Sequence, residues 1–427
     1  MSDVVAREPA VAGAQRGATR PRWISSAEIP NDRAAALTGG AELRWLTATH
    51  ELAGWGSAIR IPVGTGPQRF AGAAAALERQ VAALHPAGGP PTADLPPVAF
   101  CSFTFDPGAQ DSVMVVPRLL VRRRDGRAWV TAITDRPPDR GDLLPPPPPA
   151  TDPPGGRVRY AGTTATEIAW IDAVDRAVRR IRAGEVEKVV LARDRVVYSR
   201  TPFAAGRLVA RLHATFPTCF VFHVAGLVGA SPELLVRRDG ARVTSLVLAG
   251  TAPRGRDAAH DDALGDALLR SDKDLAEHRP AVTSVRRVLE PVTTALAVDD
   301  RPSLLRLANV QHLATAVSGT LRRPVPALEL AGHLHPTAAV GGTPRAAALA
   351  MIGELETIDR GRYAGPVGWV DGNGDGELAI ALRCAELDGS RARLFAGAGI
   401  VAGSLPESEL EETRLKLRAM QSAFEDR

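Results

Sequence analysis

A proline-rich stretch from Arg136 to Gly156 places the firmest limit on how this 427-residue chain can fold. It contains five consecutive prolines, Pro145–Pro149, and two further Pro-Pro pairs. Proline fixes φ near about −65° and has no amide hydrogen, so the run favours a stiff polyproline II segment and neither a helix nor a sheet strand. The chain is long enough for two or three average domains or for one large layered fold. The stretch is therefore either a linker between domains or a surface loop within one domain.

The composition is that of a globular protein with a sizeable core, and it excludes two classes of function. Apolar residues make up 45% of the chain, but no apolar run reaches the roughly 18 residues that a membrane span needs. The formal charge is only +4 and aromatic residues make up 4%, so a nucleic-acid-binding surface is not expected. Residues 1–22 lack the apolar centre of a signal peptide. We therefore expect a cytoplasmic protein with no membrane or nucleic-acid partner.

The residues before the proline-rich stretch predict a β-rich scaffold without clustered chemistry. Short strands are expected at Val98–Phe105, Ser112–Val121 and Ala128–Ile133, with turns between them. After the stretch, Thr164 and Glu167 form a capping-box pair at the start of a helix. Apolar residues then recur at helical spacing, at Ile168, Ile171, Val174, Val178 and Ile181, and Gly184 stands where the helix should end.

Lysine is rare in this chain: of 52 Lys and Arg residues, only Lys188, Lys273 and Lys416 are lysines. Arginine stays protonated in proteins, whereas a desolvated lysine can lose its proton and act as a base, so these three are candidates for chemistry. Codon bias is the alternative explanation. Lys188 begins a β-type run that extends to Val197, where burial would lower its pKa. Its position fits equally well a strand-end lysine that reaches into water.

Glu233 is a candidate general acid. It follows an expected hairpin, Phe220–Val224 with Leu227–Ala230, and lies in a largely apolar segment. Burial there would raise its pKa, as a general acid requires, although such a glutamate can also be a helix cap or an ion-pair partner. Leu246–Thr251 reads as a strand that ends in a Gly-Thr turn, whose backbone amides could bind an anion.

Two acidic helical segments suggest a metal site. In the first, three side chains fall on one helix face: Asp274, Glu277 and His278. In the second, one face carries Glu409, Glu412 and Lys416. Carboxylates from two helices suit Mg²⁺, which takes one or two of them directly and keeps water for the rest. A solvated acidic face is the alternative for each helix.

Three other patterns do not support the function that they resemble. The glycines of Gly397–Ala402 precede acidic residues that would repel a dinucleotide phosphate. Asp371–Gly376 opens like an EF-hand loop but has Leu382 where the bidentate Glu is required, so it predicts a glycine-rich turn. His333 and His335 are far from any cysteine, and the three cysteines are isolated from one another, so neither zinc nor disulfides are expected.

The order of several segments resembles the chorismate-utilising enzymes, which include isochorismate, salicylate, anthranilate and aminodeoxychorismate synthases. The resemblance is dense from Thr163 to Met420 and rests on EVEKVVLAR, GASPELLV, LAGTAPRG, DKDLAEH, VQHL, HPTAAVGGTP, RGRYAGPVGWVD, ALRCAEL, LFAGAGIVAGS and ELEETRLKL. It implies an α+β fold in one large domain, residues 1–427, with two facing antiparallel sheets and outer helices. Residues 1–160 would form the scaffold half, with the proline-rich loop at about 136–156, and residues 161–427 the catalytic half.

Within that family, three positions indicate the activity that the resemblance implies. Lys188 matches the lysine that activates water in isochorismate and salicylate synthases. Ala249 stands where many aminodeoxychorismate synthases have a nucleophilic lysine, and Ala339 where salicylate and anthranilate synthases usually have Thr. The expectation is an isochorismate synthase, an isomerase whose product feeds menaquinone, siderophore or other pathways. Salicylate synthase and an inactive homologue that serves as a binding subunit are the alternatives.

The resemblance also implies the roles of the site residues. Lys188 would be the base and Glu233 the acid in water attack on chorismate. Mg²⁺ would be held by Glu277 and Glu412, with Asp274 and Glu409 acting through water. The substrate-binding set would be Gly250, Thr251, His312, Ala339, Arg383, Gly397 and Lys416. Lys273 receives no role beyond that of a charge on a helix surface. A water-using enzyme needs no glutaminase subunit, and a monomer is expected.

Overall fold

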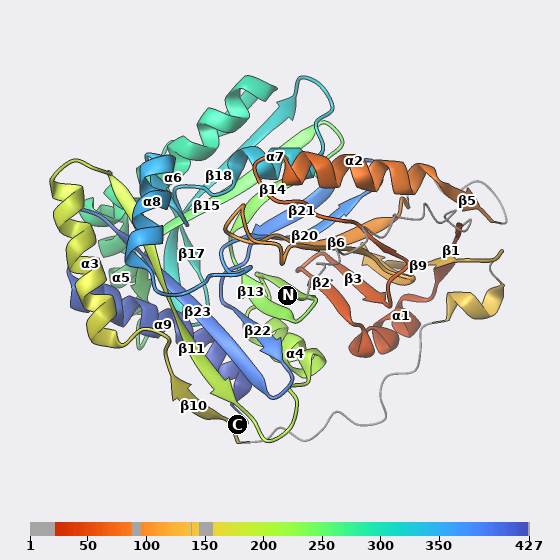
Figure 1. Cartoon of the computed structure of the whole chain (residues 1–427), viewed down its shortest axis with the longest axis horizontal. Helices are drawn as coiled ribbons and strands as arrows, with labels where there is room; N and C mark the ends of the chain where they lie inside the picture. Colours follow the sequence, from red (N-terminus) through yellow and green to blue (C-terminus); the bar gives the residue numbers. More distant parts are fainter. Residues whose placement is uncertain (1–21, 88–94, 138, 145–156, 426–427) are drawn as a thin grey trace, which may run out of the picture.

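The computed structural model describes residues 22–87, 95–137, 139–144 and 157–425. Two large β-sheets face each other and helices cover their outer sides (Figure 1). This is the α+β architecture that the sequence predicts. Most of the proline-rich stretch, residues 145–156, lies outside the described residues, so the choice between linker and loop, and with it the domain boundaries, stays a prediction.

The larger sheet combines strands from both sides of the proline-rich stretch. Every strand pairing in it is antiparallel except that of β1 with β5. Within the described residues its 13 strands run in the order β10 (Arg159–Gly162), β11 (Lys188–Tyr198), β23 (Arg391–Ile400), β22 (Cys384–Asp388), β13 (Leu227–Ser231), β12 (Phe220–Val224), β2 (Leu43–Leu46), β3 (His50–Trp55), β8 (Leu119–Arg124), β9 (Arg127–Thr134), β1 (Arg22–Ile29) and β5 (Leu84–Pro86), with β19 (Gly342–Thr343) on β11.

The second sheet is also built from both parts of the chain. The part of the chain that the structure describes gives it ten strands: β16 (Thr293–Val298), β18 (Val310–Leu321), β15 (Arg242–Pro253), β14 (Leu234–Asp239), β21 (Gly376–Ile380), β20 (Pro366–Asp371), β6 (Val98–Ser102), β7 (Val113–Val116) and β4 (Ile59–Arg60), with β17 (Ser303–Arg306) on β18. Buried aromatic side chains from both sheets, such as Phe222 and Phe100, share one hydrophobic core. Trp45 Nε1 also donates across the interface to Glu377 Oε1 at 2.7 Å.

The α-helices among the described residues are α1 (Asn31–Leu37), α2 (Arg69–Ala82), α3 (Glu167–Arg182), α4 (Ala205–Thr215), α5 (Ala258–Arg270), α6 (Asp272–Leu289), α7 (Ala327–Leu334), α8 (Arg345–Leu355) and α9 (Pro406–Phe424). Two of them carry the predicted acidic faces: α6 packs against β15, and α9 packs against β23. Each therefore lies on a different sheet. In the described part of the chain, no helix combines the length and the apolar character needed to cross a membrane.

Helix α3 forms where the apolar spacing predicts it, but its first turn differs from the prediction. The N-cap is Thr166, whose hydroxyl accepts from the Ala169 amide, because Thr164 instead donates to Asp194 from both its amide and its hydroxyl. The predicted capping box is therefore wrong. Ile168 is 80% exposed, while Trp170 supplies the buried contact at that end of the helix. Gly184, with φ of +81°, follows the helix end as expected.

Two strand predictions also change. Ser112–Val121 contains a break, because β7 ends at Val116 and β8 begins at Leu119. Leu246–Thr251 does not end in a turn: β15 continues to Pro253 through a bulge at Gly250, whose φ is +83°. The positive φ explains why glycine stands at this position. Asp371–Gly376 joins β20 to β21 as the predicted glycine-rich turn.

Candidate active site

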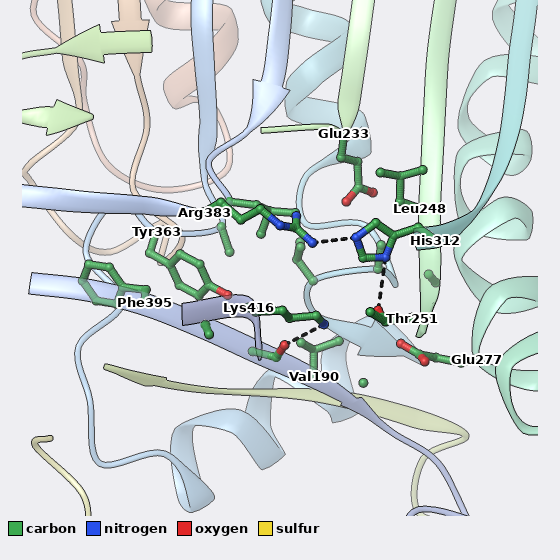
Figure 2. Close-up of a pocket in the computed structure, with 18 of the residues that line it drawn as sticks. Val190, Glu233, Leu248, Thr251, Glu277, His312, Tyr363, Arg383, Phe395 and Lys416 are labelled. Carbon is green, nitrogen blue, oxygen red and sulfur yellow. Dashed lines mark hydrogen bonds between the residues drawn. The ribbon is translucent and has the colours of Figure 1, made fainter. Parts of the chain in front are cut away.

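A cavity lies where β11 and β23 of the larger sheet approach β15 and helix α6 (Figure 2). Nine of the predicted site residues line it: Glu233, Gly250, Thr251, Glu277, His312, Ala339, Arg383, Gly397 and Lys416. Four predicted residues are not part of this lining: Lys188, Asp274, Glu409 and Glu412. Lys188 and Glu412 pair with the lining residues Glu277 and Lys416, Asp274 lies against Gly250, and Glu409 pairs with Lys273. The structure thus gathers residues that are up to about 230 positions apart in sequence into one place.

Lys188 is fully buried at the start of β11. Its Nζ lies 3.3 Å from Glu277 Oε1 and donates to the Glu277 carbonyl at 3.2 Å. A lysine that reaches into water is therefore excluded. Gly399 on the neighbouring strand makes this pair possible, because a Cβ there would lie 2.0 Å from Glu277 Oε1 and 3.0 Å from Lys188 Cε. The small-residue segment of β23 thus makes room for a buried ammonium–carboxylate pair.

Glu233 is a buried carboxyl group between β13 and β14, only 3% exposed. Burial raises its pKa to about 8, although a backbone hydrogen bond from Leu248 and the positive charges of Lys188 and Arg383 act in the opposite direction. Ser231 holds the local backbone, since its hydroxyl accepts from the Glu233 amide at 3.3 Å and donates to the Ile380 carbonyl at 2.6 Å. At neutral pH the cavity therefore contains a carboxylic acid that can give up a proton.

His312 links Arg383 to the bulge of β15 (Figure 2). Arg383 Nη2 donates to His312 Nε2 at 2.6 Å, and His312 Nδ1 lies 3.2 Å from the Gly250 carbonyl and 3.1 Å from Thr251 Oγ1. These bonds assign the proton to Nδ1 and the acceptor role to Nε2. Burial and the charge of Arg383 hold the pKa of His312 well below its usual range. A neutral histidine therefore aims the guanidinium into the cavity.

The wall of the cavity contains residues to which the sequence assigned no role. Tyr363 and Phe395 are stacked with ring centres 5.1 Å apart and planes 8° from parallel. A Cβ at Gly397 would lie 3.1 Å from the Tyr363 hydroxyl, so this glycine lets the aromatic pair approach β23. Arg360 donates to the Val190 carbonyl at 2.7 Å and braces the wall behind them. The segment RGRYAGPVGWVD contains both Arg360 and Tyr363, but neither periodicity nor charge marks it as a wall.

The four predicted metal ligands come from the two acidic helices, and three of them are paired with lysines. Lys273 Nζ lies 2.7 Å from Glu409 Oε1, and Lys416 Nζ lies 2.6 Å from Glu412 Oε1. Lys188 pairs with Glu277 as described above. Asp274 accepts a hydrogen bond from the Ser271 hydroxyl at the N-terminus of α6. Among the described residues, no three His, Cys, Asp or Glu side chains are close enough together to hold a metal ion.

The chemistry of these carboxylates nevertheless fits Mg²⁺. All four offer oxygen, and Mg²⁺ needs only one or two direct carboxylates. Burial and the negative charge of Glu412 raise the pKa of Glu409. Burial acts to lower the pKa of Lys273, but the charges of Glu409, Glu412 and Glu277 outweigh it and raise that pKa. A divalent cation would offset the same negative charges once the lysine pairs open.

Comparison with known proteins agrees with this geometry. Residues 149–425 match the family model described as chorismate binding enzyme. The chain belongs to this family. It is 42% identical to isochorismate synthase DhbC of Bacillus subtilis over 265 residues, which are 59% of this chain and 67% of DhbC. It is 41% identical to isochorismate synthase EntC of Escherichia coli K12 over 256 residues, which are 59% of this chain and 66% of EntC.

The similarity of fold extends beyond the matched sequence. The solved structure of MenF, the menaquinone-specific isochorismate synthase of Escherichia coli, matches with a TM-score of 0.79 and 26% identity over 96% of each chain. This match includes the strands that precede the proline-rich stretch. The sequence matches, by contrast, span about two thirds of the length of DhbC and EntC.

Proposed function

We propose that this chain is an isochorismate synthase, which converts chorismate to isochorismate with the help of Mg²⁺. The observation that carries the proposal is a buried glutamic acid, whose pKa burial raises, on a cavity beside a fully buried lysine, in a chain similar to DhbC, EntC and MenF. The reaction adds water at ring C2, shifts the double bonds and releases the C4 hydroxyl. It therefore needs one group that accepts a proton and one that donates it.

Lys188 is the proposed base and Glu233 the proposed acid. Water forms a bond to C2 and gives its proton to the Lys188 amine, which acts in its neutral form after the proton shared with Glu277 has passed to solvent. Glu233, with a pKa of about 8, keeps its proton at neutral pH. It gives this proton to the hydroxyl at C4, which leaves as water. The net change moves one hydroxyl group and consumes no oxidant or reductant.

The two carboxylates of chorismate explain the cations at the cavity. Arg383, aimed by His312, and Lys416 would bind the enolpyruvyl carboxylate, and Lys416 must exchange its contact with Glu412 for the substrate. Gly250, Thr251 and Gly397 supply backbone and hydroxyl contacts beside them. Glu277 and Glu412 would bind Mg²⁺, with Asp274 and Glu409 acting through water. When bound, the metal supplies the positive charge that holds the ring carboxylate.

Product analysis tests the proposal directly. Incubation of the purified chain with chorismate and Mg²⁺ is expected to give isochorismate, resolved by chromatography, without release of pyruvate. Ala339 borders the cavity and stands where the resemblance places Thr in salicylate and anthranilate synthases, which favours isomerisation without pyruvate loss. Growth of salicylate fluorescence together with pyruvate would identify a salicylate synthase instead. Absence of any Mg²⁺-dependent turnover would identify a binding subunit. Within this proposal the enzyme is cytoplasmic, monomeric and independent of a glutaminase.

A further inference from the structure

Each of the three lysines of the chain forms an ion pair with a carboxylate of the proposed metal site. The three Nζ–Oε1 distances are 3.3 Å for Lys188–Glu277, 2.7 Å for Lys273–Glu409 and 2.6 Å for Lys416–Glu412. Lys188 and Lys416 have parts in the proposed reaction. Lys273 does not line the cavity, and its ammonium joins helix α6 to Glu409 on helix α9.

The environment of Glu409 requires a positive charge. Its side chain is 1% exposed, and a carboxylate that is buried without a cation is strongly destabilising. Lys273 supplies that charge at 2.7 Å, and the charges of Glu412 and Glu277 also act on its ammonium. The charge of Lys273 therefore partly balances three of the four carboxylates proposed to bind Mg²⁺, namely Glu409, Glu412 and Glu277.

The side chain of Lys273 has access to water. It is 35% exposed, and its flexible four-carbon stem carries a compact charge that water solvates strongly. An arginine would present a larger planar fork that holds a carboxylate through two bonds. Lysine at this position, in a chain that otherwise uses arginine, therefore gives a pair that opens more easily.

We propose that Lys273 is the resident counter-ion of the metal site: it balances Glu409 in the metal-free enzyme and competes with Mg²⁺ for the same carboxylates. The inference rests on the metal assignment made under the proposed function. Lys273 would thereby set the affinity for Mg²⁺ without touching the substrate. In thermodynamic terms, loss of its charge strengthens metal binding and destabilises the metal-free state.

Calorimetric titration of the full chain with MgCl₂ alone tests this inference. Lys273→Met keeps an unbranched stem without the charge and is expected to bind Mg²⁺ about tenfold more tightly than the unaltered chain, within the usual range of coupling between sites. Arg279→Met is the matched control, since it removes one positive charge from an exposed position on the same helix. Its affinity for Mg²⁺ should stay close to that of the unaltered chain. Lys273→Arg keeps the charge and should not reproduce the gain.

Thermal unfolding supplies a readout that a purely structural brace would not give. Lys273→Met should unfold at a lower temperature than the unaltered chain in EDTA and should recover most of the difference at saturating Mg²⁺. An equal loss in both conditions, or unchanged or weaker Mg²⁺ binding by Lys273→Met, would overturn the inference. So would an unaltered chain that binds no Mg²⁺. The assay for isochorismate is separate, so a failure of the lysine role is distinguishable from a failure of the proposed function.

Discussion

The substitution Glu233→Gln is expected to stabilise the fold while it removes activity. Glu233 lies in a buried site that disfavours its ionised form. Burial raises its pKa to about 8 from an ordinary value of 4.5. Glutamine is nearly isosteric and carries no charge at any pH. Its side-chain oxygen can still accept the hydrogen bond that the Leu248 amide donates to the carboxyl group.

The size and sign of the effect follow from proton linkage. Below pH 4.5 both the folded and the unfolded chain hold the proton, so Glu233 costs nothing. Between pH 4.5 and 8 only the folded chain holds it, and the free energy of unfolding falls by about 1.4 kcal/mol per pH unit. The cost is therefore about 3 kcal/mol at pH 7 and levels off near about 5 kcal/mol above pH 8. The Gln variant avoids this cost.

Guanidinium unfolding at several pH values measures the effect. Buried histidines, such as His312, also change the pH dependence of stability, so the useful quantity is the difference between the variant and the unaltered chain. That difference should be small at pH 4.5 and grow steadily to pH 8. Glu78→Gln, at an exposed position of α2, is the control and should give no such growth. A constant difference from pH 5 to pH 8 would refute the burial argument for Glu233.

Three further predictions concern the reaction. The rate kcat/KM should fall as pH rises through about 8, because Glu233 must be protonated to act as an acid, and a rate that is level from pH 7 to pH 9 would contradict this role. Lys188→Ala should lower kcat by about 10²–10⁴-fold, as loss of a general base does, and Lys188→Arg should be nearly as inactive since arginine keeps its proton; near-normal kcat in either variant would exclude Lys188 as the base. Glu277→Gln and Glu412→Gln should raise the Mg²⁺ concentration needed for half-maximal rate and regain rate when metal is added, whereas Glu233→Gln should show no such rescue; the opposite pattern in this titration would require the roles to be exchanged.

Local patterns predicted the elements of the fold better than their ends. The helical spacing of Val174, Val178 and Ile181 identified α3, because a helix buries one stripe whatever its partner is. Its cap was misassigned since Thr164 bonds to Asp194, about 30 residues away, and no local rule contains that contact. Strand β15 likewise continues beyond Gly250, because β18 pairs with β15 on both sides of the bulge. The two-sheet architecture itself came from the family resemblance.

The candidate site was predicted where chemistry singles out a residue type. Lysine among arginines and carboxylates in apolar or helical segments are visible in the sequence, and they marked Glu233, Glu277 and Lys416, which line the cavity. His312, Ala339, Arg383 and Gly397 line it too, but they came from the family resemblance. The aromatic wall of Tyr363 and Phe395 was missed, because two aromatic residues that are 32 positions apart give no signal before β23 is placed. The requirement for a residue without a Cβ at position 399 was missed for the same reason. It depends on the contact between Glu277 and Lys188, which lies against Gly399.

The pairing of each lysine with an acidic ligand gives a physical reason for the unusual composition. Each proposed role asks for something that arginine lacks: Lys188 must give up a proton, Lys416 must exchange a carboxylate of the protein for one of the substrate, and Lys273 must yield to a metal ion. Elsewhere, arginine makes lasting contacts, such as the two bonds from Arg254 to Asp261 at 2.7 Å each. A strong, fixed ion pair stabilises the fold there. At the cavity, such a pair would keep the carboxylates from binding a metal ion and the cations from binding the substrate. The cations that must change partner or protonation state are thus the ones that remained lysine.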